Sequence, residues 1–150
     1  MKKYVLCSLL SVLLAGCTLE SEFGLPNDEK IDIRLLGEWG VKKENAEYVS
    51  ILKNSNNTYK ILLVSNDTTQ EILAHSKTIK GHRIINLSND NGTSNTFYAF
   101  KVNANTLTFF EVNDQLTDKE FVSESALLSY FEENIKKKNF FINKTKWKRK

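Results

Sequence analysis

Short segments rich in β-branched and aromatic residues follow one another along the chain, and most are bounded by Asn, Asp, Gly or Ser. This pattern is typical of strands joined by hairpin turns. The alternation of apolar and polar positions is clearest at Tyr98, Phe100 and Val102, which should therefore share one face of a strand. We predict strands at residues 34–41, 48–52, 58–64, 71–78, 82–87, 96–102, 107–112 and 140–150.

The turns between these segments support the same fold class. Lys80-Gly81 and Asn91-Gly92 are strong hairpin signals, and Asn, Asp and Ser dominate most of the other breaks. About seven or eight strands at such close spacing favour an antiparallel meander, or a small barrel that closes and so removes its exposed edges. We therefore expect a mainly β domain with hairpin connections.

One segment has the period of a helix instead. Ser123 is a good N-cap, and Val122 and Leu127 occupy the two positions of a hydrophobic staple. We predict a helix near residues 124–138 that packs on the barrel or across its mouth. Its apolar stripe consists of Leu128, Phe131 and Ile135.

The first seventeen residues have the pattern of a targeting signal. Lys2 and Lys3 precede an uncharged, Leu-rich stretch at 4–15, which is too short to cross a bilayer as a helix. The stretch ends in Leu14-Ala15-Gly16-Cys17. This tetrapeptide resembles the lipobox of bacterial lipoprotein precursors, although an ordinary cleaved signal that contains a Cys is the alternative.

The lipobox resemblance implies a cellular location for the chain. Residues 1–16 would be the signal peptide, and Cys17 would carry a diacylglyceryl group and further acyl chains such as palmitate. Two or more acyl chains anchor a protein stably, whereas one does not. We expect an exported domain anchored to a membrane of a bacterial cell envelope, and to the outer membrane if the bacterium is Gram-negative.

Composition sets the size of the domain and excludes some chemistry. Removal of residues 1–16 leaves 134 of the 150 residues, enough for one domain, and lowers the formal net charge from +3 to +1 because Lys2 and Lys3 leave with the signal. Apart from Cys17 the mature chain has no Cys, so it has no internal disulfide and no thiolate metal site. Residues 17–33 are polar and predict a flexible tether, which leaves 34–150 as the folded domain.

The first predicted strand contains Gly37-Glu38-Trp39. This tripeptide resembles the Gly-X-Trp of lipocalins and related small barrels, and the resemblance implies a lipocalin-like domain in which Trp39 closes one barrel end. Gly37 and Trp39 are therefore candidate barrel-closing or ligand-contacting residues. The alternative is a Trp that is simply buried in a β core, which its large apolar area favours.

Catalytic and metal-binding patterns are weak in this chain. His75 and His82 are its only histidines, and two His residues without a third ligand make a poor zinc site. The sequence contains neither a Gly-X-Ser-X-Gly nucleophile motif nor a Gly-rich phosphate loop. We therefore expect a protein that is not an enzyme and that needs no cofactor or metal.

The C-terminal segment holds the one notable cluster of charge. Such a cluster can bind an anionic lipid head group or a glycan, with a Trp that stacks on the ligand, whereas export argues against nucleic acid as the partner. The alternative is an edge strand with a solvated basic face, where Lys deters aggregation. The residues are Lys144, Lys146, Trp147, Lys148 and Arg149.

Two functions from different classes follow from these patterns. The first is a non-enzymatic interaction or structural module that contacts an envelope protein or glycan. The second is a carrier that holds a small apolar ligand inside the barrel, although side chains fill the interior of a short eight-stranded barrel more easily than a ligand does. The sequence leaves the partner and the oligomeric state open.

Overall fold

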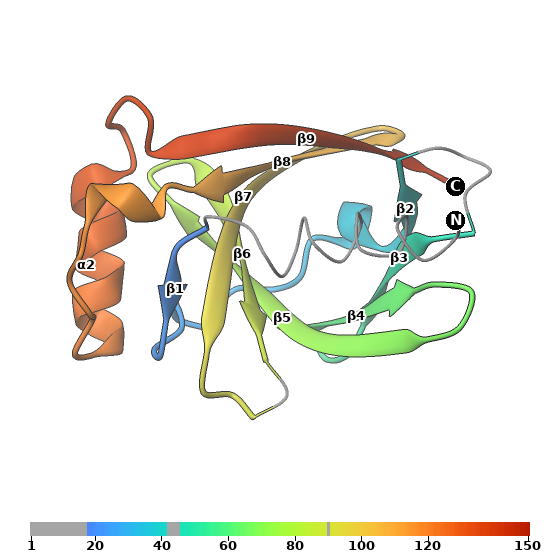
Figure 1. The fold of residues 1–150 in the computed structure, drawn as a ribbon, viewed down its shortest axis with the longest axis horizontal. Coiled ribbons are helices and arrows are strands. Elements are labelled where there is room, and N and C mark those ends of the chain that lie inside the picture. The colour runs from blue at the N-terminus through green and yellow to red at the C-terminus, as the bar shows by residue number, and fades with distance from the viewer. Residues whose placement is uncertain (1–17, 42–45, 90) are drawn as a thin grey trace.

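The computed structural model describes residues 18–41, 46–89 and 91–150, so the predicted signal peptide and Cys17 lie outside the described residues. Eight antiparallel strands form a closed barrel in which each strand pairs with the next and the last pairs with the first (Figure 1). This confirms the predicted fold class. The strands are β2 (Gly37–Gly40), β3 (Tyr48–Lys53), β4 (Tyr59–Val64), β5 (Thr69–Ile79), β6 (His82–Ser88), β7 (Asn95–Asn103), β8 (Thr106–Val112) and β9 (Phe141–Arg149).

The hairpins follow the turn chemistry of the sequence. Lys80 and Gly81, with φ of 48° and 83°, join β5 to β6 in a tight turn, and Gly92 lies between β6 and β7 with φ of 65°. Along β4, Tyr59, Ile61 and Leu63 are buried, whereas the residues between them are only partly buried. The apolar run at 61–64 therefore has one face in the barrel interior and the other near the surface.

Two apolar cores lie on the two sides of the sheet. The first fills the barrel and contains Tyr98 and Phe100, with Val102 packed against it, so the predicted shared face is confirmed. The second lies between the outer face of the sheet and α2 (Glu124–Asn134), which stands at one end of the barrel (Figure 1). Its central side chains are Ile84, Phe97, Leu127, Phe131 and Phe140.

The helix differs from its prediction at both ends. The Ser123 hydroxyl accepts a hydrogen bond from Ala126 N at 3.0 Å, which confirms the N-cap. The helix ends at Asn134, before the exposed run of lysines at 136–138, so the predicted end at 138 is wrong. Val122 is 83% exposed, so it cannot form the predicted staple with the buried Leu127.

The segment before the barrel is packed on it, which corrects the expectation of a flexible tether for residues 18–33. Its strand β1 (Glu20–Ser21) pairs with the start of β7, and Leu19 and Leu25 are almost fully buried. The Asn86 side chain accepts from Leu25 N at 2.8 Å and donates to Asn95 Oδ1 at 2.8 Å. These buried bonds satisfy the polar backbone and hold the segment in place.

A short 3₁₀ helix, η1 (Ile33–Leu35), follows this segment and leads into β2. Asp32 is its N-cap, and its side chain accepts from Arg34 N at 3.0 Å. Leu35 is 1% exposed and belongs to the core inside the barrel. The 3₁₀ helix thus covers one end of the barrel with an apolar side chain.

Candidate functional site

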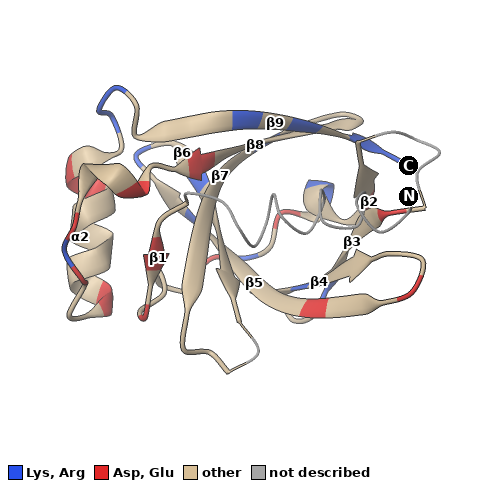
Figure 2. Cartoon of the chain, viewed as in Figure 1, with Lys and Arg blue, Asp and Glu red and all other residues tan. Residues whose placement is uncertain are grey.

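The basic residues near the C-terminus lie on both faces of β9. Lys144, Lys146 and Lys148 are exposed and point outward. Figure 2 shows Lys and Arg positions in blue along β9. Lys146 pairs with Thr108 of β8, which in turn pairs with Lys101 of β7. The outer face of these three strands therefore carries a row of lysines that is free to meet an anionic surface.

Trp147 does not belong to this outer row. It is 4% exposed and its ring packs edge to face on Phe109 inside the barrel, with 4.6 Å between the ring centroids. Successive side chains of a strand point to opposite faces, so Trp147 lies inward between two outward lysines. The expectation that Trp147 stacks on a surface ligand is therefore wrong.

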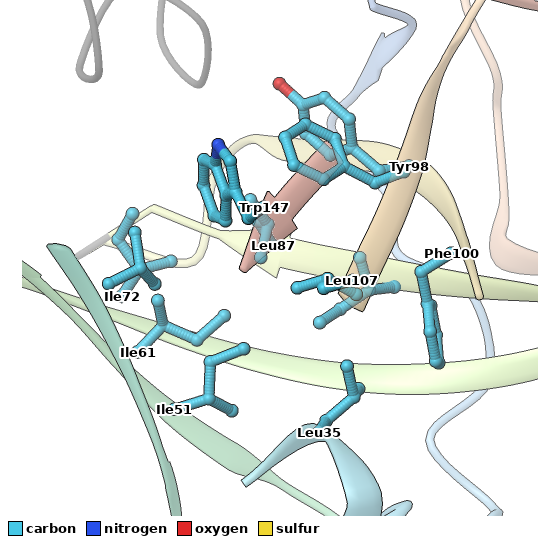
Figure 3. A pocket seen from close by; sticks show the side chains of 12 residues that line it. Leu35, Ile51, Ile61, Ile72, Leu87, Tyr98, Phe100, Leu107 and Trp147 are labelled. Carbon is cyan, nitrogen blue, oxygen red and sulfur yellow. The ribbon is translucent and has the colours of Figure 1, made fainter. Parts of the chain in front are cut away.

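The barrel interior holds a small apolar cavity (Figure 3). Its volume is about 50 Å³, and only apolar surface lines it. An engineered cavity of ~150 Å³ holds one benzene, so this space is small even for a single aromatic ring. Its walls are Leu35, Val49, Ile51, Ile61, Ile72, Ile85, Leu87, Tyr98, Phe100, Leu107, Phe109 and Trp147.

Trp39 and Arg149 meet at the end of the barrel covered by η1. The guanidinium of Arg149 lies over the Trp39 ring, with Cζ 4.2 Å from the centroid, and donates to the carbonyls of Leu36 at 2.8 Å and Arg34 at 3.0 Å. Trp39 is fully buried and its Nε1 donates to Leu35 O at 2.8 Å. Arg149 thus binds the backbone around η1 rather than standing free for an anionic surface.

Gly37 belongs to the same arrangement. Its φ is +134°, and a Cβ at this position would lie 2.5 Å from Arg149 Nη1. A side chain here would displace the guanidinium from its place over Trp39. The structure therefore brings Gly37, Trp39 and Arg149 together, and neither Gly37 nor Trp39 lines the interior cavity.

Asp32 links two arginines beside this closed end. Its carboxylate accepts from Arg34 Nη2 at 2.8 Å and from Arg83 Nη1, and its backbone N–H donates to the Tyr59 hydroxyl at 2.6 Å. The hydrogen bonds from Arg34 and the charge of Arg83 lower the pKa of Asp32 to about 2. Asp32 therefore stays ionised at neutral pH, and its side chain is only 6% exposed.

A recess with three cationic side chains in its walls lies where β6 and β7 separate. Their pairing ends at Ile84 and Ala99, and beyond this pair the two strands form the sides of a notch of about 330 Å³. Both aromatic and cationic side chains line it. The lining includes Arg34, His82, Arg83, Phe100, Lys101, Phe110 and Phe141.

The sequence did not indicate the notch, because its walls come from five separate segments of the chain. Among the lining residues, the sequence singles out only His82 as a candidate ligand, as a partner of His75 in a zinc site. In the barrel His75 pairs with Asn86 and His82 pairs with Ile79, so the two histidines do not face each other. His75 Nε2 instead donates to Leu25 O at 2.7 Å, and His82 packs on Phe141 with 5.4 Å between centroids.

Metal ligation and membrane spanning can be assessed for the described residues. No group of three or more His, Cys, Asp or Glu side chains lies close enough to hold a metal ion in this part of the chain. Over the same residues, no helix has both the length and the apolar character needed to span a membrane. Comparisons with protein-family models, with curated proteins and with solved structures found no match to this chain.

Proposed function

We propose that this chain is a non-enzymatic binding module, held at a bacterial envelope membrane by lipid on Cys17. The lipobox-like sequence at 14–17 supports the anchor. The apolar cavity of only about 50 Å³ supports the use of the outer surface for binding, because side chains already fill most of the interior. We expect an envelope protein or glycan as the partner.

The proposed lipid anchor is tested by replacing the Cys17 thiol. Cells that express the chain are fed a clickable palmitate, and the wild-type chain is compared with Cys17→Ser. We expect label and membrane association for the wild type only. Equal membrane association of both chains, or an unlabelled wild type, would refute the lipid anchor.

The binding surface is tested by crosslinking in intact cells. Lys144, Lys146 and Lys148 are exposed on the outer face of β9, so their replacement by Gln leaves the barrel interior unchanged. We expect the triple substitution to weaken the crosslinks to an envelope component. The matched control is Lys53→Gln on β3, which is exposed but lies away from this row.

The alternative function is a carrier of a small apolar ligand, and the apolar lining of the interior cavity favours it. Titration with a fluorescent fatty acid separates the two functions. Saturable uptake that Val49→Phe abolishes would support the carrier, because Val49 lines the cavity. Uptake that Val49→Phe leaves unchanged would place the probe elsewhere on the protein.

A further inference from the structure

We infer that the notch between β6 and β7 binds a small aromatic monocarboxylate. The inference goes beyond the proposed function and does not depend on the lipid anchor, since the residues that carry it lie between Asp32 and Phe141 and do not include Cys17. It also differs from the carrier function, because the notch opens to solvent at the side of the barrel, outside the interior cavity. Its lining and charge identify the chemistry of the ligand.

The backbone opens the notch. β6 and β7 stay paired from Ser88 and Asn95 to Ile84 and Ala99, and the pairing stops there although both strands continue. Ile79, at the end of β5, packs into the core beneath α2 rather than into the barrel. The tip of the β5–β6 hairpin is thereby directed away from β7, which leaves a recess of about 330 Å³, within the size range of small-molecule sites.

Positive charge exceeds negative charge around the notch. Arg34, Arg83 and Lys101 line it, and among the described residues Asp32 is the one carboxylate bonded to these cations. Asp32 engages each arginine through only part of its guanidinium, so both keep further N–H donors. Lys101 forms no ion pair with any residue in the described ranges. The notch can therefore accept one more carboxylate.

Aromatic rings form the apolar part of the notch. Phe100 lies beneath Arg83, with the guanidinium carbon 5.1 Å from the ring centroid, and is 4% exposed. Phe141 packs between His82 and Phe110, at centroid distances of 5.4 Å and 6.5 Å. Such tilted rings favour a further ring over a flexible chain, because aromatic pairs gain from edge-to-face contact.

Phe100 also separates the notch from the interior cavity, since it lines both. The ring is buried, so a ligand in the notch would meet an aromatic floor. The notch thus suits a ligand with one carboxylate and one ring rather than a long acyl chain.

The test uses phenylbutyrate and its neutral analogue phenylbutanol as probes. The full chain is titrated with each compound by calorimetry, in lipid nanodiscs if it carries lipid and in buffer if it does not, and the same medium without protein provides the reference. We expect saturable binding of phenylbutyrate and at least about tenfold weaker binding of phenylbutanol, since a hydrogen bond to a charged group contributes about that factor. Equal affinity for both probes, or no saturable binding of phenylbutyrate, would overturn the inference.

Matched variants then locate the binding. Lys101→Gln should weaken the binding of phenylbutyrate about tenfold. Lys146→Gln should leave it unchanged, because Lys146 is exposed on the same outer face but lies outside the notch. Asp32→Asn should tighten binding although it destabilises the fold, because it removes the competing carboxylate. A loss of affinity in Asp32→Asn with the fold intact, or an equal effect of the two lysine variants, would show that the notch is not the site.

These outcomes are distinct from failure of the proposed function. A chain that lacks lipid on Cys17 can still show the expected order of affinities for phenylbutyrate, with weaker binding in Lys101→Gln than in Lys146→Gln. If an anchored chain bound neither probe, the inference about the notch would be refuted, whereas the proposed lipid anchor would stand.

Discussion

Arg149 is stacked on Trp39, and its guanidinium carbon lies 4.2 Å from the centroid of the indole. The same guanidinium donates to two carbonyls around η1. One side chain of β9 therefore holds both β2 and the 3₁₀ helix that precedes β2. A cation over a Trp and charge-assisted bonds to backbone each stabilise a fold. Closure of this barrel end therefore depends on a contact between β2 and β9, the first and last strands of the barrel along the chain.

The first prediction concerns Arg149. Arg149→Ala should lower the free energy of unfolding by about 3 kcal/mol, because it removes the stacked cation and two hydrogen bonds. Urea unfolding, followed by Trp fluorescence, measures the change. Arg149→Lys should recover only part of the loss, since an ammonium lacks the planar fork that reaches both carbonyls.

Gly37→Ala provides the second prediction. At φ of +134° a Cβ is strained, and it would lie 2.5 Å from Arg149 Nη1. We expect a loss of about 2 kcal/mol in the wild type, measured by the same urea titration. In an Arg149→Ala background the loss should be smaller, because the clash is gone. An equal loss in both backgrounds would show that Gly37 serves only its own backbone conformation.

The contrast between strands and site shows what the sequence could reveal. The strand positions were predictable because alternation and turn chemistry are local, as at Tyr98, Phe100 and the Lys80-Gly81 turn. The contact of Trp39 with Arg149 was not predictable from the sequence, since it depends on how the barrel closes. The inward position of Trp147 had a local signal, because Lys144, Lys146 and Lys148 alternate with it, but the density of charge suggested a single basic surface.

The N-terminal segment shows a second limit. Its many acidic residues, with Pro26 and Gly24, favoured a solvated tether. Leu19 and Leu25 are sparse along the segment, yet both are buried, and Asn86 and Asn95 satisfy the backbone between them. Those two asparagines lie on β6 and β7, so composition alone could not show that the segment had polar partners.

The third prediction concerns Tyr130, whose hydroxyl is buried without a hydrogen-bond partner, alone in this respect among side chains of the described segments. Tyr130→Phe should leave stability unchanged or raise it by up to about 1 kcal/mol, because it removes an unsatisfied polar group. Tyr59→Phe is the matched control. Its hydroxyl accepts from Asp32 N and contacts Ser76 Oγ at 3.1 Å, so its loss should destabilise by about 1–2 kcal/mol. Thermal unfolding of the two variants compares them.

The fourth prediction concerns pH. Burial lowers the pKa of His75, and the Leu25 carbonyl, Glu124 and Asp28 only partly oppose this effect. The unfolded chain therefore binds a proton more readily than the folded chain, so stability falls as pH drops below the ordinary His pKa of about 6.5. His75→Gln keeps a donor for Leu25 O and cannot titrate. We expect a flatter dependence of unfolding free energy on pH between about pH 7 and pH 5 in this variant, and equal slopes would contradict the account.

The last prediction joins the anchor to the packed N-terminal segment. The Thr18 hydroxyl donates to Phe97 O at 2.5 Å and accepts from Val112 N at 3.3 Å, and Leu19 N donates to Val112 O at 2.8 Å. Cys17 directly precedes Thr18, and neighbouring Cα atoms are ~3.8 Å apart. A lipid on Cys17 would therefore hold the barrel against the bilayer with one fixed side toward it.

Fluorophores on single cysteines can measure this orientation. Leu116 and Leu52 are both 43% exposed. Leu116 lies in η2 (Asp114–Leu116), close after β8. Leu52 lies on β3, which is four strands from β7, the strand with which β1 pairs. In the lipidated chain we expect quenchers in the lipid to reach a fluorophore at Leu116→Cys and not one at Leu52→Cys. A flexible Gly-Ser insertion between Cys17 and Thr18 should abolish the difference, because the barrel could then turn freely. Equal quenching without the insertion would show that the side near Thr18 is not held toward the membrane.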